Sequence, residues 1–276
     1  MAPAAVHAGG EGGRRVPELA ASIEGIGFWA QGLGSWEAAR AYVAGGALPD
    51  PTAKRPSPQL LAPNERRRAP ESVAVALEVA LAACTAAGRD PATLPSVFAS
   101  MHGDLAITDY MCATLATDPT AISPTRFHNS VHNAAAGYWT IGAACVQPAT
   151  AVSSFDATFA QGLLEALVQL HAGAPAVLLV AYDAPSAGPL ARVSPSSGLL
   201  GGALVLSRPL LAGRPRIRCT LRDAQAPAPE GPLAALSGGN AMAPMLPLFG
   251  ALASGDDLAC LHAGPGRALR VEISHA

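Results

Sequence analysis

The sequence predicts an α/β fold, and three features of its 276 residues support this. A β-type run at 150–154 is followed by an apolar helical run at 157–171 and by the wholly apolar run 176–182. A strand without alternation is covered on both faces, as in a parallel sheet. Half of the residues are apolar and only 14% are charged, against roughly 25% in an average globular protein. So little charge indicates a buried core and at least one face covered by another subunit.

The first elements are marked by turn and cap residues. Residues 1–16 are rich in glycine and alanine and are expected to be a disordered lead-in. A strand is predicted over 22–30. A short helix then begins after Ser35 as its N-cap and stops at Gly45. The segment 47–65 carries five prolines and is expected to be a loop.

Helices and one buried strand follow in the next part of the chain. A helix over 72–87 is ended by Gly88. The run 95–101 is predicted as a buried strand and 105–116 as a helix, with a loop after it. Residues 133–145 are predicted as a small-residue helix that permits close packing.

The helix over 157–171 carries a thin polar stripe of Gln161, Glu165 and Gln169, which recur every four residues. The rest of its surface is apolar. Such a helix is expected to be largely buried between sheets.

The remaining elements lie after a loop rich in proline, serine and glycine. Strands are predicted over 202–208 and 216–222, a helix over 241–254, and a closing strand over 268–273. The glycines that begin the first of these strands do not form a phosphate loop, because no Lys-Ser/Thr follows them. They are expected to ease a bend or close packing.

The composition excludes several classes of protein. A net charge of −2 gives no case for binding nucleic acid or anionic membranes. The five cysteines are odd in number and contain no C-x-x-C pair, which suits reduced thiols in a cytoplasmic protein. The N-terminus lacks the apolar region of a signal peptide. A membrane span needs about 18 apolar residues in a row, and the sequence has no such run.

One long segment carries a family resemblance. HNAAAGYWTIGAACVQPATAVSSFDATFAQGLLEALVQLHAG resembles the segment of β-ketoacyl synthases, in the thiolase superfamily, that leads into and includes the nucleophile helix. The two sequences align without a gap from Asn133 to Gly173. SIEGIGFWA and LGGALVLSR resemble the opening and closing strands of the family's first half. The resemblance therefore extends over about residues 22–208.

A second segment narrows the resemblance. FASMHGDLAITDYMCATLATDPTAISPTRFHNSVHNAAAGYW is similar to a short, divergent ketosynthase-like group. Members of that group accompany full-length ketosynthases in aryl-polyene pathways as chain-length-factor-like subunits. The resemblance implies a thiolase-like layered α/β fold with a truncated C-terminal half. Residues 17–210 would form the ketosynthase-like N-terminal half, and residues 211–276 a reduced remnant of the C-terminal half.

The resemblance also implies that the catalytic residues are missing. In an active ketosynthase a cysteine lies at the helix N-terminus, where the helix dipole stabilises its thiolate, and two histidines drive decarboxylation of the malonyl group. The gap-free alignment puts Asp156 in the place of the cysteine. The His-Gly-Thr-Gly-Thr motif is replaced by RDAQAPAPEGPLAALS. The second histidine motif is matched by SGGNAMAP, which puts Asn240 in the place of that histidine.

Asp156 also has an ordinary structural explanation. Aspartate is among the best N-caps and is worth about 0.5–2 kcal/mol over alanine. Its carboxylate is therefore expected to accept hydrogen bonds from the backbone N–H groups of Thr158 or Phe159. This interpretation is compatible with a lost nucleophile.

Other reactive residues give weaker patterns. His128 and His132 have the spacing of two metal ligands on one helix face, but no glutamate or third ligand accompanies them. Hydrogen bonding at the start of the helix at Asn133 is expected instead. Cys112 and Cys145 could form a cysteine–histidine pair with them, but their positions within predicted helices favour the core. No metal or cofactor is predicted.

These features together predict a catalytically silent ketosynthase-like subunit. It would pair with a full-length β-ketoacyl synthase, meet acyl carrier protein through that complex, and help to set the length of the acyl chain. One alternative is a malonyl-acyl carrier protein decarboxylase, although that chemistry still needs the histidines. Another is a stand-alone acyl-binding protein.

Two sets of residues are predicted to carry this role. The resemblance implies that the strand 150–154 pairs antiparallel with its mate across a dimer axis, so it would lie at the subunit interface. A gate for the acyl chain is expected on one face of the helix 105–116 and on the nearest bulky ring. The alternative is that the gate residues fill the subunit's own core. The interface residues are Thr150, Val152 and Ser154, and the gate residues are Thr108, Met111, Cys112, Leu115 and Phe127.

Overall fold

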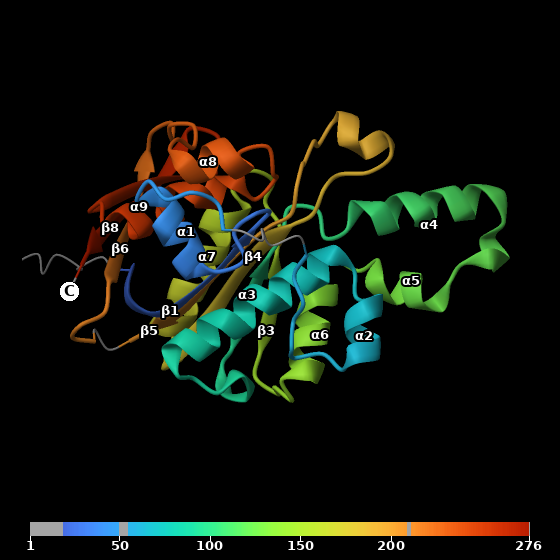
Figure 1. The fold of residues 1–276 in the computed structure, drawn as a ribbon, viewed down its shortest axis with the longest axis horizontal. Coiled ribbons are helices and arrows are strands. Elements are labelled where there is room, and N and C mark those ends of the chain that lie inside the picture. The colour runs from blue at the N-terminus through green and yellow to red at the C-terminus, as the bar shows by residue number, and fades with distance from the viewer. Residues whose placement is uncertain (1–18, 50–54, 209–210, 276) are drawn as a thin grey trace, which may run out of the picture.

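The computed structural model describes residues 19–49, 55–208 and 211–275, and it has three layers (Figure 1). A single eight-stranded sheet in the order β3-β2-β4-β5-β1-β6-β8-β7 has helices on both faces. Strand β2 runs parallel to β3 and β4, and the other pairs are antiparallel. The predicted layered α/β class is confirmed. The strands are β1 (Leu19–Ala30), β2 (Ser96–Ala99), β3 (Ala149–Val152), β4 (Ala176–Asp183), β5 (Leu200–Ser207), β6 (Arg216–Asp223), β7 (Leu258–Gly264) and β8 (Arg267–Ser274).

The helices divide between the two faces of the sheet. Helices α3 and α6 pack on one face, and α7 and α9 pack on the other. The α-helices are α1 (Trp36–Val43), α2 (Pro63–Arg68), α3 (Glu71–Ala87), α4 (Leu105–Thr117), α5 (Pro124–Asn129), α6 (Ala134–Gly142), α7 (Thr158–His171), α8 (Pro232–Ser237) and α9 (Leu246–Ser254).

Strand β4 shows why its apolar run has no alternation. All eight of its residues are buried. Val177 and Leu179 face the cluster that contains α7, whereas Leu178 and Val180 face the cluster that contains α3. Both faces of the strand are therefore covered, as the sequence predicted.

Glycines allow the helices to approach the sheet closely. A Cβ on Gly27 of β1 would lie 2.0 Å from the carbonyl oxygen of Val79 on α3. On the opposite face, a Cβ on Gly202 of β5 would lie 2.5 Å from the ring of Phe249 on α9. The predicted role of the β5 glycine in close packing is confirmed.

The strands within residues 211–275 extend this sheet rather than form a second one. The first four residues of β1, Leu19–Ser22, pair with β6, and β8 and β7 follow to the far edge. Helix α7 was expected to lie between two sheets. It packs instead against the single sheet that the described residues form. Strand β7 was not predicted, although alternating residues before a Gly-Pro-Gly turn are a hairpin signal.

Several predicted boundaries shift where proline begins a helix. The expected loop after α4 contains α5, which begins at Pro124 with Ser123 as N-cap. The predicted helix 241–254 is a 3₁₀ turn, Ala243–Met245, followed by α9. Proline is tolerated in the first turn of a helix because no intrahelical hydrogen bond is lost there. The predicted lead-in, 1–16, lies outside the described residues.

Candidate functional site

The turn between β3 and α7 carries the position of greatest interest. Strand β3 ends at Val152, so Ser154 lies beyond the strand that was predicted to include it. Phe155 has φ of 47°, a rare conformation for a bulky residue, and its side chain is 80% exposed. The hydroxyl of Thr158 fastens the turn, because it accepts from the N–H of Ser154 at 2.9 Å and donates to the carbonyl of Phe155 at 2.5 Å.

Asp156 follows this strained residue and does not cap the helix. The N-cap of α7 is Ala157, and no side chain caps it among the described residues. The predicted hydrogen bonds to Thr158 and Phe159 are therefore wrong. The turn at Phe155 shifts the helix start by one residue, and the Asp156 side chain is exposed, without a hydrogen-bond or ion-pair partner in the described part of the chain.

A buried carboxylate lies behind this turn, at the end of β4. Asp183 is 0% exposed and accepts from the hydroxyl of Ser100 at 2.7 Å and the N–H groups of Met101 and His102 at 2.9 and 3.2 Å. Burial raises the pKa of Asp183 to about 7, although these donors favour its ionised form. Ser153 donates to the carbonyl of Met101 at 3.0 Å and so connects the network to the turn.

Two histidines belong to the same network. The Nε2 atom of His102 lies 2.6 Å from the hydroxyl oxygen of Ser194, and burial lowers the pKa of this histidine. The Nε2 atom of His132 bonds the carbonyl of Ser100 at 2.7 Å. His128, by contrast, lies on α5 against the ring of Tyr138, with centroids 6.0 Å apart. The two candidate ligands are thus not on one helix.

Metal ligation finds no further support in the described part of the chain, where no three His, Cys, Asp or Glu side chains are grouped to hold an ion. Of the two cysteines expected in the core, only one is buried. Cys145 is buried, as predicted, and its thiol lies 3.5 Å from the carbonyl of Leu94. Cys112 is exposed on α4 and is not a core residue.

Asn240 ties the C-terminal segment to the same end of the sheet. It is 4% exposed, and its amide nitrogen lies 3.2 Å from the carbonyl of Asp183 and 2.9 Å from that of Gly198. Its side-chain oxygen accepts from the N–H of Met242 at 2.9 Å. These bonds occupy the amide, so Asn240 acts as a link between segments.

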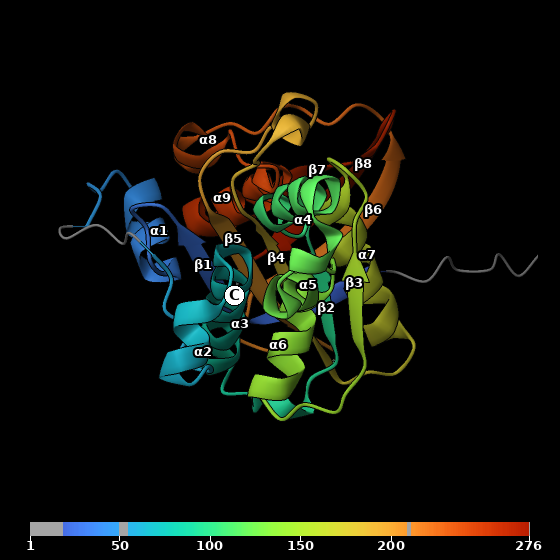
Figure 2. The same ribbon diagram turned by 90° about the vertical axis from the view of Figure 1, so that its right-hand side faces the viewer.

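The predicted gate residues lie on an arm formed by α4 and α5, which projects from the body in Figure 1 and points toward the viewer in Figure 2. Thr108 and Met111 are half-buried, whereas Cys112 is exposed and Leu115 is 51% exposed. Phe127 on α5 is 60% exposed. The exposed members therefore do not fill the subunit's own core.

Strand β3 is an edge strand of the sheet. Among the described residues, β2 pairs with one side of it and no strand pairs with the other side. The N–H of Ser96 bonds the carbonyl of Pro148, and that of Ser100 bonds the carbonyl of Val152. Alternate residues of a parallel strand direct their backbone groups to the same side, so Ala149 and Ala151 direct theirs away from β2. These outward groups form an open edge, and Thr150 and Val152 are half-buried beside them.

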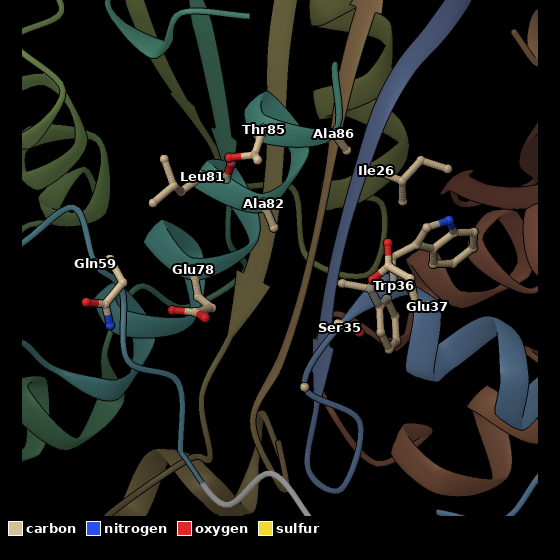
Figure 3. Close-up of a pocket in the computed structure, with 12 residues that line it drawn as sticks. Ile26, Ser35, Trp36, Glu37, Gln59, Glu78, Leu81, Ala82, Thr85 and Ala86 are labelled. Atoms are coloured by element: carbon tan, nitrogen blue, oxygen red, sulfur yellow. The ribbon is translucent and has the colours of Figure 1, made fainter. Parts of the chain in front are cut away.

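A hollow of about 380 Å³ lies elsewhere, between α3 and the start of α1 (Figure 3). Trp36 and Glu37 line one side, and Glu78 and Gln59 line the other. Burial has the largest effect on Glu78 and raises the pKa of its carboxyl. A hydrogen bond from the backbone of Ser57 and the charge of Arg66 lower this pKa by less. None of the predicted site residues lines this hollow.

Comparison with known proteins identifies the family. The family model described as "Beta-ketoacyl synthase, N-terminal domain" matches residues 36–253, which is most of the chain. The chain belongs to this β-ketoacyl synthase family. No curated protein compared with the chain matches it.

Solved ketosynthase structures share the fold. One is the ketosynthase ApeO in complex with its chain length factor ApeC from Xenorhabdus doucetiae, with a TM-score of 0.71, 23% identity, and coverage of 91% of this chain and 98% of that one. The ishigamide ketosynthase/chain length factor has a TM-score of 0.70 and 17% identity, and covers 92% and 99% of the two chains. A third, AntDE:AntF, is a type II polyketide acyl-carrier protein in complex with its ketosynthase, with a TM-score of 0.71, 13% identity, and coverage of 93% and 99%.

The buried network around Asp183 was not predicted from the sequence of this ketosynthase-family chain. Asp183 and His102 each directly follow a predicted buried strand. Polar residues at the carboxyl ends of neighbouring parallel strands lie close together, and this signal was available.

Within the described residues, no helix has the length and hydropathy needed to cross a bilayer.

Proposed function

We propose that the chain is a catalytically silent, chain-length-factor-like subunit of a β-ketoacyl synthase complex. It pairs with a full-length ketosynthase, which supplies the nucleophile, and meets acyl carrier protein through that complex. The reaction served is chain extension of the fatty-acid or polyketide type, with aryl polyenes as the expected product class. The subunit helps to set the length of the chain.

The observation that carries this proposal is the turn before α7. A condensing enzyme needs a thiolate there and a basic partner for decarboxylation. Asp156 instead offers an exposed carboxylate, which is a poor nucleophile toward a thioester at neutral pH. Asn240, in the aligned position of a histidine, holds three segments together through its amide.

The open edge of β3 supports the pairing with a ketosynthase. Exposed apolar side chains flank this strand, with Val146 before it at 93% exposure and Phe155 after it at 80%. Apolar groups beside unpaired backbone groups are typical of a surface that another chain covers. We propose that Thr150, Val152 and Ser154 lie at this interface.

Co-expression with a neighbouring full-length ketosynthase tests the proposal. The two chains should co-purify as one complex, and Val152→Asp should abolish it. The pair should extend malonyl-carrier protein, whereas this chain alone should release no carbon dioxide from it. Decarboxylation by the isolated chain would favour the decarboxylase, and a complex unchanged by Val152→Asp would contradict the interface.

A further inference from the structure

A cavity of about 610 Å³ opens at the base of the α4–α5 arm. Its walls come from the junction of α2 and α3, from the arm, and from residues 184–187 after β4. Its volume lies within the range of roughly 300–1,000 Å³ that is usual for small-molecule sites. No residue of the turn at Asp156 lines this cavity, so the cavity is separate from that turn.

Two arginines lie at the rim of this cavity. Arg68 ends α2 and Arg126 lies on α5, and both are exposed. The guanidinium of Arg126 is held over the ring of Tyr110, 4.0 Å from its centroid. Neither arginine has a carboxylate partner within the described residues. Their charges are therefore available to an anion, and guanidinium groups match phosphate oxygens in geometry.

The first turn of α3 lies on the same wall. This 17-residue helix begins at Glu71 after Pro70, and no side chain caps it in the described part of the chain. The unbonded N–H groups of such a first turn attract anions. The carboxylate of Asp104 is already engaged, by the Ser72 hydroxyl at 2.7 Å and the N–H of Ile107 at 3.0 Å. These neutral donors leave its charge in place, so the carboxylates of Asp104 and Glu71 both oppose an anion, against the two arginines and the helix N-terminus.

A buried amide at the inner wall points independently to a ligand. Asn129 lines the cavity and is 4% exposed, and its Oδ1 atom has no hydrogen-bond partner among the described residues. A buried acceptor left unpaired costs about 1–3 kcal/mol. A donor on a molecule in the cavity would remove that cost.

We propose that this cavity binds the phosphate of a phosphorylated small molecule, with Arg68 and Arg126 contacting the phosphate at the rim and Asn129 bonding a polar group of the same ligand further in. The ligand is either free inorganic phosphate or a phosphate ester that carries amide or hydroxyl groups. The site uses residues that the proposed chain-length role does not need, so the two proposals stand or fall separately.

Calorimetric titration of the full chain at constant ionic strength tests this site. The probes are 4′-phosphopantetheine, pantetheine, which lacks only the phosphate, and inorganic phosphate. Phosphopantetheine should bind at least about tenfold more tightly than pantetheine. Equal affinity for phosphopantetheine and inorganic phosphate would identify the free ion as the ligand, whereas tighter binding of phosphopantetheine would identify an ester.

Variants connect the binding to the cavity. Arg68→Gln and Arg126→Gln should each weaken phosphate binding roughly tenfold, and Glu71→Gln should strengthen it. Asn129→Leu should remove any preference for the ester over inorganic phosphate. Arg67→Gln is the matched control, because Arg67 is exposed beside Arg68, bonds Asn64 and does not line the cavity. No binding of any phosphate probe, or binding unchanged in both arginine variants, would overturn the proposal.

Discussion

At the scale of single residues, the exposed Asp156 allows a direct test of catalytic silence. Asp156→Cys places a thiol just before α7, where the helix dipole favours a thiolate, so iodoacetamide should label it. The variant should still form no carbon–carbon bond when assayed alone, because Asn240 offers no base for decarboxylation. Mass spectrometry of the labelled protein and product analysis check both parts. Condensation by this single variant without a partner would refute the silent-subunit proposal.

Glu78 gives a prediction about stability and pH. Burial raises the pKa of its carboxyl above the ordinary 4.5, so folding disfavours the ionised form. This cost is absent below the unfolded pKa and fully present above the folded pKa. Glu78→Gln keeps the acceptor oxygen and removes the charge, so it should raise the melting temperature at pH 7.5 by about 1–3 °C and have little effect near pH 4.

Glu37→Gln is the control for Glu78, because Glu37 lines the same hollow and is exposed. Its melting temperature should follow the wild type at both pH values. A Glu78→Gln protein that melts at or below the wild-type temperature at pH 7.5 would show that the carboxylate has a stabilising partner.

The sequence predicted residue positions better than residue contacts. The register from Asn133 to Gly173 identified Asp156, but not its geometry, because the positive φ of Phe155 depends on how the turn packs. The buried Asp183 was overlooked, since its three donors come from residues more than eighty positions away. Such long-range bonds leave no local pattern, so only the position of Asp183 directly after a buried strand could have indicated them.

At the scale of elements, the backbone directions of β3 make its open edge testable. Ala151 directs its N–H away from β2, so Ala151→Pro removes an outward donor while the ladder with β2 remains. Proline is tolerated on edge strands for this reason. We expect the subunit to fold and the complex with the ketosynthase to weaken or disappear in size-exclusion chromatography.

Thr150→Pro is the matched control at this edge. Thr150 directs its N–H toward β2, so the substitution removes a ladder bond and should lower the melting temperature of the subunit itself. If Ala151→Pro assembles as well as the wild type, the partner does not pair with this edge.

The elements that the sequence predicted well carry local signals. Ser35 caps α1 and Gly88, with φ of 64°, ends α3, as expected. Strand β7 and helix α5 were missed, although a Gly-Pro-Gly turn and a Ser-Pro start mark them. Helix α5 has a single large apolar residue, Phe127, so only its turn chemistry carries a signal, whereas β7 is short and its alternation is marked by small residues.

At the scale of the whole molecule, the low charge content is only partly explained by the chain's own core. The single sheet has helices on both faces, yet Ile141 and Val146 remain 78% and 93% exposed near the β3 edge. Composition could predict that a covered face exists, but not which face. The sheet order supplies that information, because β3 lies at an edge that the described residues leave open.

The α4–α5 arm leads to a prediction for the assembled pair. Leu115 shares a face of α4 with Met111 and is 51% exposed, and Phe127 on α5 is 60% exposed, so in the proposed pair this part of the arm can meet an acyl chain. Met111→Ala opens a void of several methylene groups in that face, so the reconstituted pair should make products longer by one or more two-carbon units. Met111→Trp should shorten them.

The control for this gate lies on the same helix. Ala113 is exposed on the opposite side of α4, so Ala113→Trp adds equal bulk away from the gate and should leave product length unchanged. Mass spectrometry of the released chains measures the shift, and size-exclusion chromatography confirms that each pair assembles. If Met111 forms the end wall of the acyl-chain site, a smaller side chain must allow longer chains and a larger one must allow only shorter chains. If both Met111 variants assemble and yield the wild-type product distribution, a different part of the interface therefore limits the chain.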